Sequence, residues 1–85
     1  MKKTIYSENY AVFLSCLRRA RKRAGLTQEQ LAERIHQTQS FVSKCERGER
    51  RVDIIELRSF CQAMDIPLME FIQQLETTLK ANDRS

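Results

Sequence analysis

Apolar residues recur along most of the chain at spacings of three and four positions, the period of a helix with one buried face. The first such segment spans residues 7–24, and its apolar positions are Tyr10, Phe13, Leu14, Leu17, Ala20 and Ala24. Ser7 is a candidate N-cap for this helix, and Gly25 is placed to end it. Because the chain shows no alternating strand pattern, we expect an all-α fold.

Two short helices with a tight turn between them are expected next. The first opens with a Thr-x-x-Gln capping box, in which Thr27 is the N-cap and Gln30 reaches back to it. The second is expected over residues 39–47, with Thr38 as its N-cap and Gly48 as its stop.

Two further helices complete the predicted order of elements. Asp53 is a good N-cap for the fourth, whose apolar positions are Ile54, Leu57, Phe60, Cys61 and Met64. Pro67 begins the fifth, expected over about residues 67–80, and its apolar stripe consists of Leu68, Phe71, Ile72, Leu75 and Leu79. We expect the last five or six residues to fray.

The chain has 85 residues, and we expect one domain, 1–85, with its folded core over about 7–79. A domain of this size buries only about 60–65% of its extended-chain surface, so dimerisation would add needed stability. Leu68 and Phe71 are assigned to the core. The remaining stripe of the fifth helix is a candidate dimerisation surface formed by Ile72, Leu75 and Leu79. The alternative is that residues 74–85 are a loose tail.

Positive charge is concentrated at the beginning of the chain. The formal net charge is +4, but residues 1–24 hold seven basic side chains, Lys2 and Lys3 among them, and one acidic one. This segment therefore carries +6, and the other 61 residues carry −2. A basic end on a small domain favours a polyanionic partner, although a solvated helix face would have the same composition.

Several classes of protein are disfavoured by what the sequence lacks. No apolar run approaches the ~18–20 residues that cross a bilayer. The three cysteines form no C-x-x-C pair and His36 is the only histidine, so we expect buried thiols in a cytoplasmic protein and no metal site. No nucleophile, carboxylate pair or phosphate loop is arranged for catalysis. We therefore expect no enzyme, no cofactor and no evident small-molecule ligand.

Two motifs carry a resemblance to a known family. Residues 25–32 read GLTQEQLA and residues 39–48 read QSFVSKCERG. At this spacing they resemble the Xre family, the phage-repressor and Cro-like helix-turn-helix proteins, and the similarity covers about residues 17–71. The resemblance implies a five-helix, lambda-repressor-like DNA-binding fold in which the second and third helices form the helix-turn-helix.

The turn departs from the family pattern at two positions. His36 stands where the family often has glycine, and Gln37 where a small apolar residue is usual. We expect the residue at position 36 to adopt a positive φ, which histidine tolerates better than most side chains.

The third helix has a polar side suited to a DNA groove. On a helical wheel, Phe41, Val42 and Cys45 form one arc, and the opposite side holds Ser40, Lys44 and Arg47 with Ser43 adjacent. This outer side carries no carboxylate, as expected of a surface that approaches phosphates. The alternative is that polar residues merely decorate the start of a helix.

Base reading is expected from the first turns of the same helix. Gln39 can donate and accept together, which matches adenine, and Lys44 could reach guanine O6 and N7. Thr38 or Phe41 could contact a thymine methyl group. The resemblance itself assigns base reading to the positions of Gln39, Ser40 and Lys44.

Phosphate contacts are expected around this helix. The resemblance gives a phosphate contact to Gln28, in the first turn of the second helix. Arg50 and Arg51 can clamp the DNA backbone from the loop after the third helix, and Arg47 is grouped with them. Phe41 completes this group. A solvated basic loop is the alternative for Arg50 and Arg51.

One ion pair is expected to be structural. Arg21 falls within the apolar arc of the first helix, where a guanidinium needs a partner, and Glu46 borders the apolar arc of the third. The family often pairs an acid and a base at these positions. We expect an Arg21–Glu46 salt bridge.

The resemblance indicates a sequence-specific regulator of transcription, a repressor in our reading, that binds duplex DNA as a homodimer on a palindromic operator. An antitoxin or a restriction–modification controller of the same fold is an alternative. A helix-turn-helix used as a protein-interaction module is another, but it would place apolar or acidic residues on the outer side of the third helix.

Overall fold

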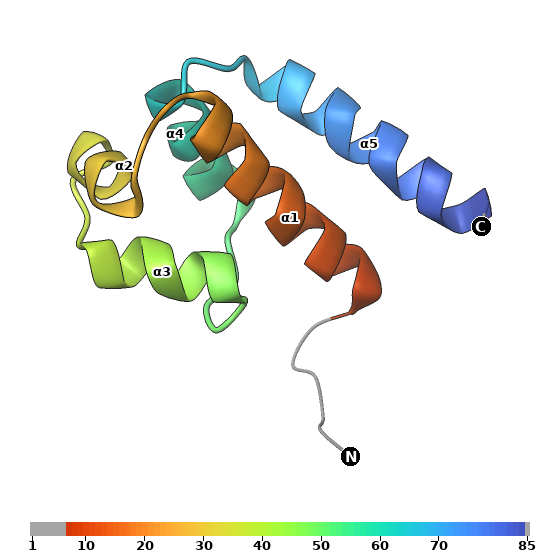
Figure 1. Cartoon of the computed structure of the whole chain (residues 1–85), viewed down its shortest axis with the longest axis horizontal. Helices are drawn as coiled ribbons and strands as arrows, with labels where there is room; N and C mark the ends of the chain where they lie inside the picture. The colour runs from red at the N-terminus through yellow and green to blue at the C-terminus, as the bar shows by residue number, and fades with distance from the viewer. Residues whose placement is uncertain (1–6, 85) are drawn as a thin grey trace.

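The structure, a computed structural model, describes residues 7–84 and consists of five helices (Figure 1). Their bounds are α1 Glu8–Arg23, α2 Gln28–Arg34, α3 Gln39–Arg47, α4 Ile54–Ala63 and α5 Leu68–Arg84. These residues contain no strand, so the all-α fold is confirmed for the part of the chain that the structure describes. Lys2 and Lys3, which contribute to the expected basic N-terminal region, lie outside it.

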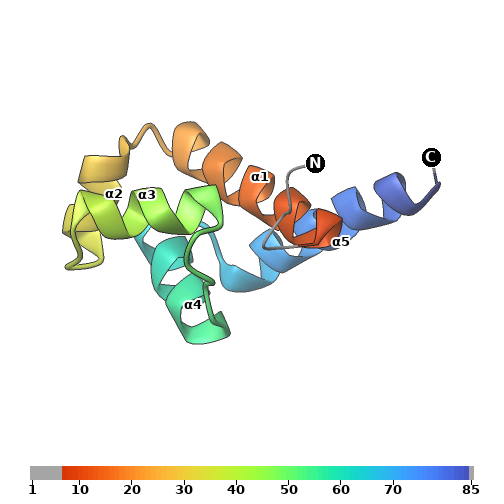
Figure 2. The same cartoon turned by 90° about the horizontal axis from the view of Figure 1, so that it is seen from below.

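The five helices pack around one core. α2 packs on α3, and α1 packs on both α3 and α5, while α4 contacts α2 and α5. Figure 2 shows α3 lying across the near side of the molecule, with α1 on one side of it and α4 on the other. None of the helices formed by residues 7–84 is both long and apolar enough to cross a lipid bilayer.

The core contains side chains from every helix. Its most deeply buried members are Leu14, Leu17, Leu31, Val42, Cys45, Phe60, Cys61 and Phe71. Phe71 is fully buried and Leu68 half-buried, as expected for the inward side of α5. The three cysteines are free and buried. Burial raises the pKa of the Cys45 thiol and raises that of Cys61 to about 11, so both remain protonated at neutral pH.

Each of the first four helices begins at the predicted cap. The side chains of Ser7, Thr27, Thr38 and Asp53 each accept a hydrogen bond from the backbone N–H three residues on. The capping box at Thr27 is present as expected. A second capping box, not anticipated, joins Asp53 and Glu56 at the start of α4.

The same four helices end in one backbone geometry. A left-handed residue follows or closes each helix: Gly25, His36, Gly48 and Asp65, with φ of 75°, 60°, 80° and 57°. The next residue in each case donates its N–H to a carbonyl five positions earlier, at 2.9–3.2 Å. The positive φ expected at His36 is therefore confirmed, and the turn between α2 and α3 is closed by Gln37 N–H on the Ala32 carbonyl.

α5 is longer than expected. It continues to Arg84, so the expected end near residue 80 is wrong. No glycine or proline follows Pro67, and the last turns contain residues with good helix propensity. An i,i+4 pair between Glu76 and Lys80, 3.8 Å apart, adds a small local stabilisation.

The expected ion pair between Arg21 and Glu46 is present in the interior. Arg21 Nε lies 2.7 Å from Glu46 Oε2 and Nη2 lies 3.1 Å from Oε1, a bidentate arrangement. The two side chains are only 10% and 2% exposed. Because both charges are buried, each depends on the other and on surrounding hydrogen bonds.

Neighbouring groups complete the bonding around this pair. Arg21 Nη1 donates to the Leu26 carbonyl at 2.9 Å, and Gln28 Nε2 donates to Glu46 Oε1 at 2.9 Å. Arg18 Nη1 donates to the backbone carbonyl of Glu46 at 2.7 Å. α1, α2 and α3 are thus joined at one buried carboxylate, which fixes how α3 is presented.

Replacing Gly25 with alanine should destabilise the protein by about 1–2 kcal/mol, because an L side chain disfavours the left-handed region. A Cβ at this position would meet nothing within 4 Å, so the loss is conformational only. Gly25→Asn should lose less, since asparagine visits this region more readily. Urea unfolding followed by circular dichroism measures both; equal losses for the two variants would contradict the explanation.

Replacing Glu46 with alanine should destabilise the protein by about 3–5 kcal/mol, because it leaves the buried Arg21 charge unpaired. The control is Glu49→Ala, which breaks an exposed pair and should change stability far less. The double variant Arg21→Met/Glu46→Leu removes both charges and should be more stable than Glu46→Ala. Similar losses for Glu46→Ala and Glu49→Ala in urea unfolding would refute a structural role for the pair.

Candidate nucleic-acid interface

α3 presents a polar side to solvent on a buried support. Gln39, Ser40 and Lys44 are exposed, and Ser43 is half-buried beside them. The opposite side is held in the interior by Val42, Cys45 and Glu46. The structure thus brings the candidate base-reading residues together on one open side of a helix, with Thr38 exposed at its N-cap.

Gln28 lies beside this helix but is engaged within the protein. Its amide nitrogen donates to Glu46, and its side chain is half-buried. Gln28 therefore positions α2 against α3, and the phosphate contact expected of it would have to use its remaining hydrogen-bonding groups.

Arg47 is not a free cation. Its Nε lies 2.8 Å from Glu49 Oε2, its Nη2 lies 3.2 Å from Glu49 Oε1, and Nη1 donates to Ser43 Oγ. The hydrogen bonds from Arg47 lower the pKa of the Glu49 carboxyl, so this acid stays ionised near neutrality. The expected acid-free outer side is therefore corrected: α3 itself follows the expectation, but the Glu49 carboxylate just beyond it reaches back to Arg47.

Arg50 is also paired. Its guanidinium meets the Glu56 carboxylate at 2.7 and 2.9 Å and lies over the ring of Phe41, 4.7 Å from the centroid. The hydrogen bonds from Arg50, followed by the backbone N–H of Asp53, lower the pKa of Glu56. Phe41 is half-buried under this guanidinium and touches Phe60 behind it. The loop after α3 is therefore ordered by side-chain contacts and is not simply solvated.

Arg51 stacks on an aromatic ring of α1. Its guanidinium lies 4.6 Å from the centroid of Tyr10, whose hydroxyl accepts the Val52 N–H at 3.0 Å. Arg51 is exposed, and its guanidinium makes no hydrogen bond or ion pair among the described residues, whereas Arg50 uses its donors on Glu56 and on the Arg51 carbonyl.

Three residues of this region were not anticipated. Arg18 supports the end of α3 through the Glu46 carbonyl, and Glu49 and Glu56 neutralise the arginines around it. The Asp-x-x-Glu spacing at 53–56 is a capping-box pattern and could have identified Glu56. The other two contacts cross between elements and leave no sequence signal.

Lys44 is the cation of α3 whose charge is not paired with a carboxylate among the described residues. It is exposed, and no ion pair or hydrogen bond of its side chain occurs among residues 7–84. No group of three or more His, Cys, Asp or Glu side chains in that range could hold a metal ion. The chemistry available on this side is therefore hydrogen bonding and positive charge.

Comparison with known proteins identifies this arrangement. Residues 17–71 match the HTH_3 helix-turn-helix family model. An uncharacterized HTH-type transcriptional regulator of Sinorhizobium fredii is 33% identical over 60 residues, which cover 71% of this chain and 78% of that protein.

Solved structures agree. An XRE-family like protein from Pseudomonas syringae pv. tomato is 41% identical with a TM-score of 0.77, covering 82% of this chain and 85% of that one. The wild-type restriction–modification controller protein C.Esp1396I shares the fold, with a TM-score of 0.80 and 22% identity over 87% of this chain and 97% of its own. Its tetramer in complex with a natural 35 base-pair operator has a TM-score of 0.77 at 22% identity, covering 85% of this chain and 95% of that one. The chain belongs to the Xre family of helix-turn-helix, DNA-binding transcriptional regulators.

Proposed function

We propose that this regulator reads its operator with the exposed side of α3 lying in the major groove. The observation that carries the proposal is the open row of Gln39, Ser40 and Lys44 on a helix whose other side is fixed by the core and by Glu46. A helix in the major groove contacts base edges with its N-terminal residues, which are the residues left exposed here.

Each of these side chains has a chemical match among the bases. Gln39 is suited to the N6 and N7 groups of adenine, and Lys44 is suited to O6 and N7 of guanine. The hydroxyl groups of Ser40 and Ser43 can donate or accept, and the Thr38 methyl group can lie against thymine.

Phosphate contacts are proposed for Arg47, Arg50 and Arg51, with Gln28 and Phe41 at their edge. The pair of Arg47 with Glu49 is exposed and the pair of Arg50 with Glu56 is partly exposed, and surface pairs of this kind contribute little to stability. A DNA phosphate can therefore take over or share these guanidinium groups at little loss of stability.

We propose that the regulator acts as a homodimer through a groove between α1, α4 and α5. This groove has a volume of about 450 Å³ and is lined largely by apolar side chains, among them Phe13, Ile54, Ile72, Leu75 and Leu79. Ile54 and Ile72 are 57% and 37% exposed and line the same groove, so their exposed apolar surface is part of one patch, as at a protein interface. A two-fold dimer would present two copies of α3 about 34 Å apart, one turn of B-DNA.

Repression of transcription from a palindromic operator is the biological role that we favour. Control of a restriction–modification operon is a second candidate, supported by the likeness of fold to C.Esp1396I, whose tetramer binds a 35 base-pair operator. An antitoxin role is the third. The genes adjoining this one would distinguish the three roles, since the same DNA-reading surface serves all of them.

Selection of bound fragments from random duplex DNA should return a palindromic site. On that site, Gln39→Ala and Lys44→Ala should each weaken binding by about 1–3 kcal/mol and relax the preference at one base pair, because each removes a base contact. Arg51→Ala is the comparison, since loss of a phosphate contact should weaken all DNA similarly and lower the salt slope by about one unit. Equal losses on selected and random DNA for Gln39→Ala and Lys44→Ala would contradict base reading by α3.

Leu79→Lys should convert the dimer to a monomer at micromolar concentrations, because each of two copies would lose ~1.5–3 kcal/mol of apolar burial. The matched control is Met69→Lys on the same helix, whose side chain is 81% exposed and does not line the groove. Sedimentation equilibrium measures both variants. A wild-type protein that sediments as a monomer, or equal behaviour of the two variants, would rule out this dimer.

A further inference from the structure

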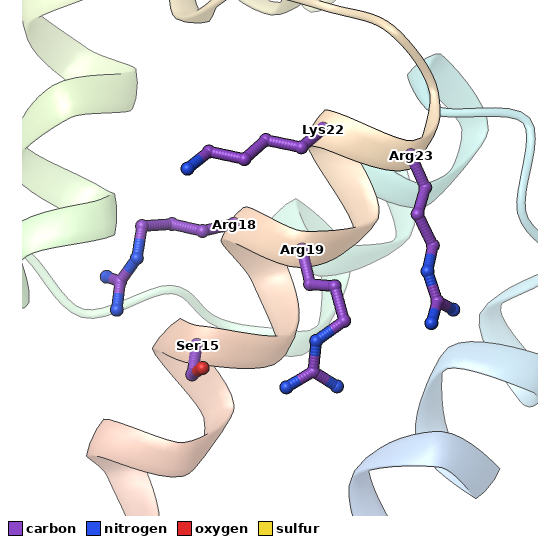
Figure 3. Close-up of a pocket in the computed structure, with 5 residues that line it drawn as sticks. All are labelled: Ser15, Arg18, Arg19, Lys22 and Arg23. Carbon is purple, nitrogen blue, oxygen red and sulfur yellow. The ribbon is translucent and has the colours of Figure 1, made fainter.

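The largest concentration of uncompensated charge lies on α1, away from the residues assigned to DNA reading. Ser15, Arg18, Arg19, Lys22 and Arg23 line an open hollow of about 440 Å³ on this helix (Figure 3). Their positions follow the i, i+3, i+4, i+7, i+8 pattern, so they share one side of α1. The buried residues Leu14, Leu17 and Arg21 lie outside this stripe. We call the five hollow-lining residues the α1 basic face.

The cations of this face have no internal counter-charge. Among the described residues, Arg19, Lys22 and Arg23 make no ion pair or side-chain hydrogen bond, and Arg18 donates only to a backbone carbonyl. Glu70 of α5 shares a neighbouring hollow with Arg19 and Arg23, but its carboxylate accepts from Gln74 and lies beyond ion-pair distance. Arg47 and Arg50, by contrast, each hold a carboxylate.

This accumulation of positive charge destabilises α1. Arg18 and Lys22 are four residues apart, as are Arg19 and Arg23, and like charges at this spacing repel. The helix dipole favours Lys22 and Arg23 in the last turn, but this effect fades before Arg18 and Arg19. A bound polyanion would relieve this repulsion. The charges therefore fit a role in binding an anionic partner and do not fit a role in stabilising α1.

We propose that the α1 basic face binds the phosphate backbone of DNA that flanks the half-site read by α3. This rests on the proposed function, because it extends the same DNA complex. Arg18 is anchored on the last turn of α3, and Figure 3 shows Arg18 and Lys22 extending on the α3 side of α1 and Arg19 and Arg23 on the α5 side. The α1 basic face therefore begins beside the last turn of α3 and continues away from Gln39, Ser40 and Lys44. Flanking DNA reaches it by bending toward the protein.

The dimensions set the size of the expected effect. Arg18 to Arg23 rises about 7.5 Å along the helix at 1.5 Å per residue. One DNA strand carries a charge about every 3.4 Å of axis, so the face matches about two phosphates. Two contacts correspond to about a tenfold gain in affinity at moderate salt and about two units of salt slope.

The test compares two duplexes that share the selected site, one trimmed to the site and one extended by about ten base pairs on each side. The wild-type dimer places one α1 basic face on each flank, so it should bind the extended duplex about a hundredfold more tightly, with a salt slope about four units steeper. The variant Arg19→Gln/Lys22→Gln/Arg23→Gln should lose this gain and bind the trimmed duplex as wild type does. Arg19→Gln alone should lose part of it, whereas the charge-matched control Arg58→Gln, exposed on α4, should keep it. Circular dichroism and thermal melting establish that each variant folds.

The outcomes separate this inference from the function on which it rests. If wild-type protein binds the trimmed site specifically but gains nothing from the flanks, the α1 basic face does not bind DNA and base reading by α3 stands. If the triple variant shows the wild-type gain and salt slope, the α1 basic face does not bind the flanking DNA and the inference is overturned. If no duplex is bound specifically, the proposed function itself fails.

Discussion

A single buried carboxylate determines how this small protein presents α3 to solvent. Glu46 accepts hydrogen bonds from Arg21 of α1 and Gln28 of α2 while belonging to α3, so three helices share one charge that cannot be left unpaired in the interior. The apolar core stabilises the fold but does not by itself fix the orientation of one helix relative to another, since apolar contacts are non-directional. The bidentate geometry of the Arg21–Glu46 ion pair fixes the orientation of α3 relative to α1. Gln39, Ser40 and Lys44 are exposed on one side of α3 because this junction and the core hold the other side inward.

The cations of the protein fall into two groups with different electrostatic roles. Arg47 and Arg50 are pre-positioned by Glu49 and Glu56, which hold their long side chains in place but reduce their net attraction for phosphate. Arg18, Arg19, Lys22 and Arg23 of α1 have no carboxylate partner among the described residues, so their positive charge is not balanced locally. In the proposed complex, orientation near the bases and attraction over longer distances would thus come from different residues.

Local chemistry explains why much of the fold could be predicted. Ser7, Thr27, Thr38 and Asp53 begin helices because a side-chain oxygen replaces a missing backbone partner, and Gly25 and Gly48 end them because glycine accepts a left-handed backbone. The Arg21–Glu46 pair followed from two charges on apolar arcs, together with the family resemblance. Other contacts were not predictable, because the pairing of Glu49 and Glu56 with arginines depends on how the loop after α3 folds back. The continuation of α5 to Arg84 was missed although no glycine or proline follows Pro67. The roles of the exposed residues depend on a DNA sequence that the chain does not encode.

The two ends of α3 are closed by main-chain bonds, Gln37 N–H on the Ala32 carbonyl before it and Glu49 N–H on the Lys44 carbonyl after it. Neither closure uses the side chains of Gln39, Ser40 or Lys44, and none of the three contributes to the core. Mutation can therefore change these three side chains while the scaffold stays intact. A lineage with this architecture is free to drift toward new target sites one residue at a time, without passing through unfolded intermediates.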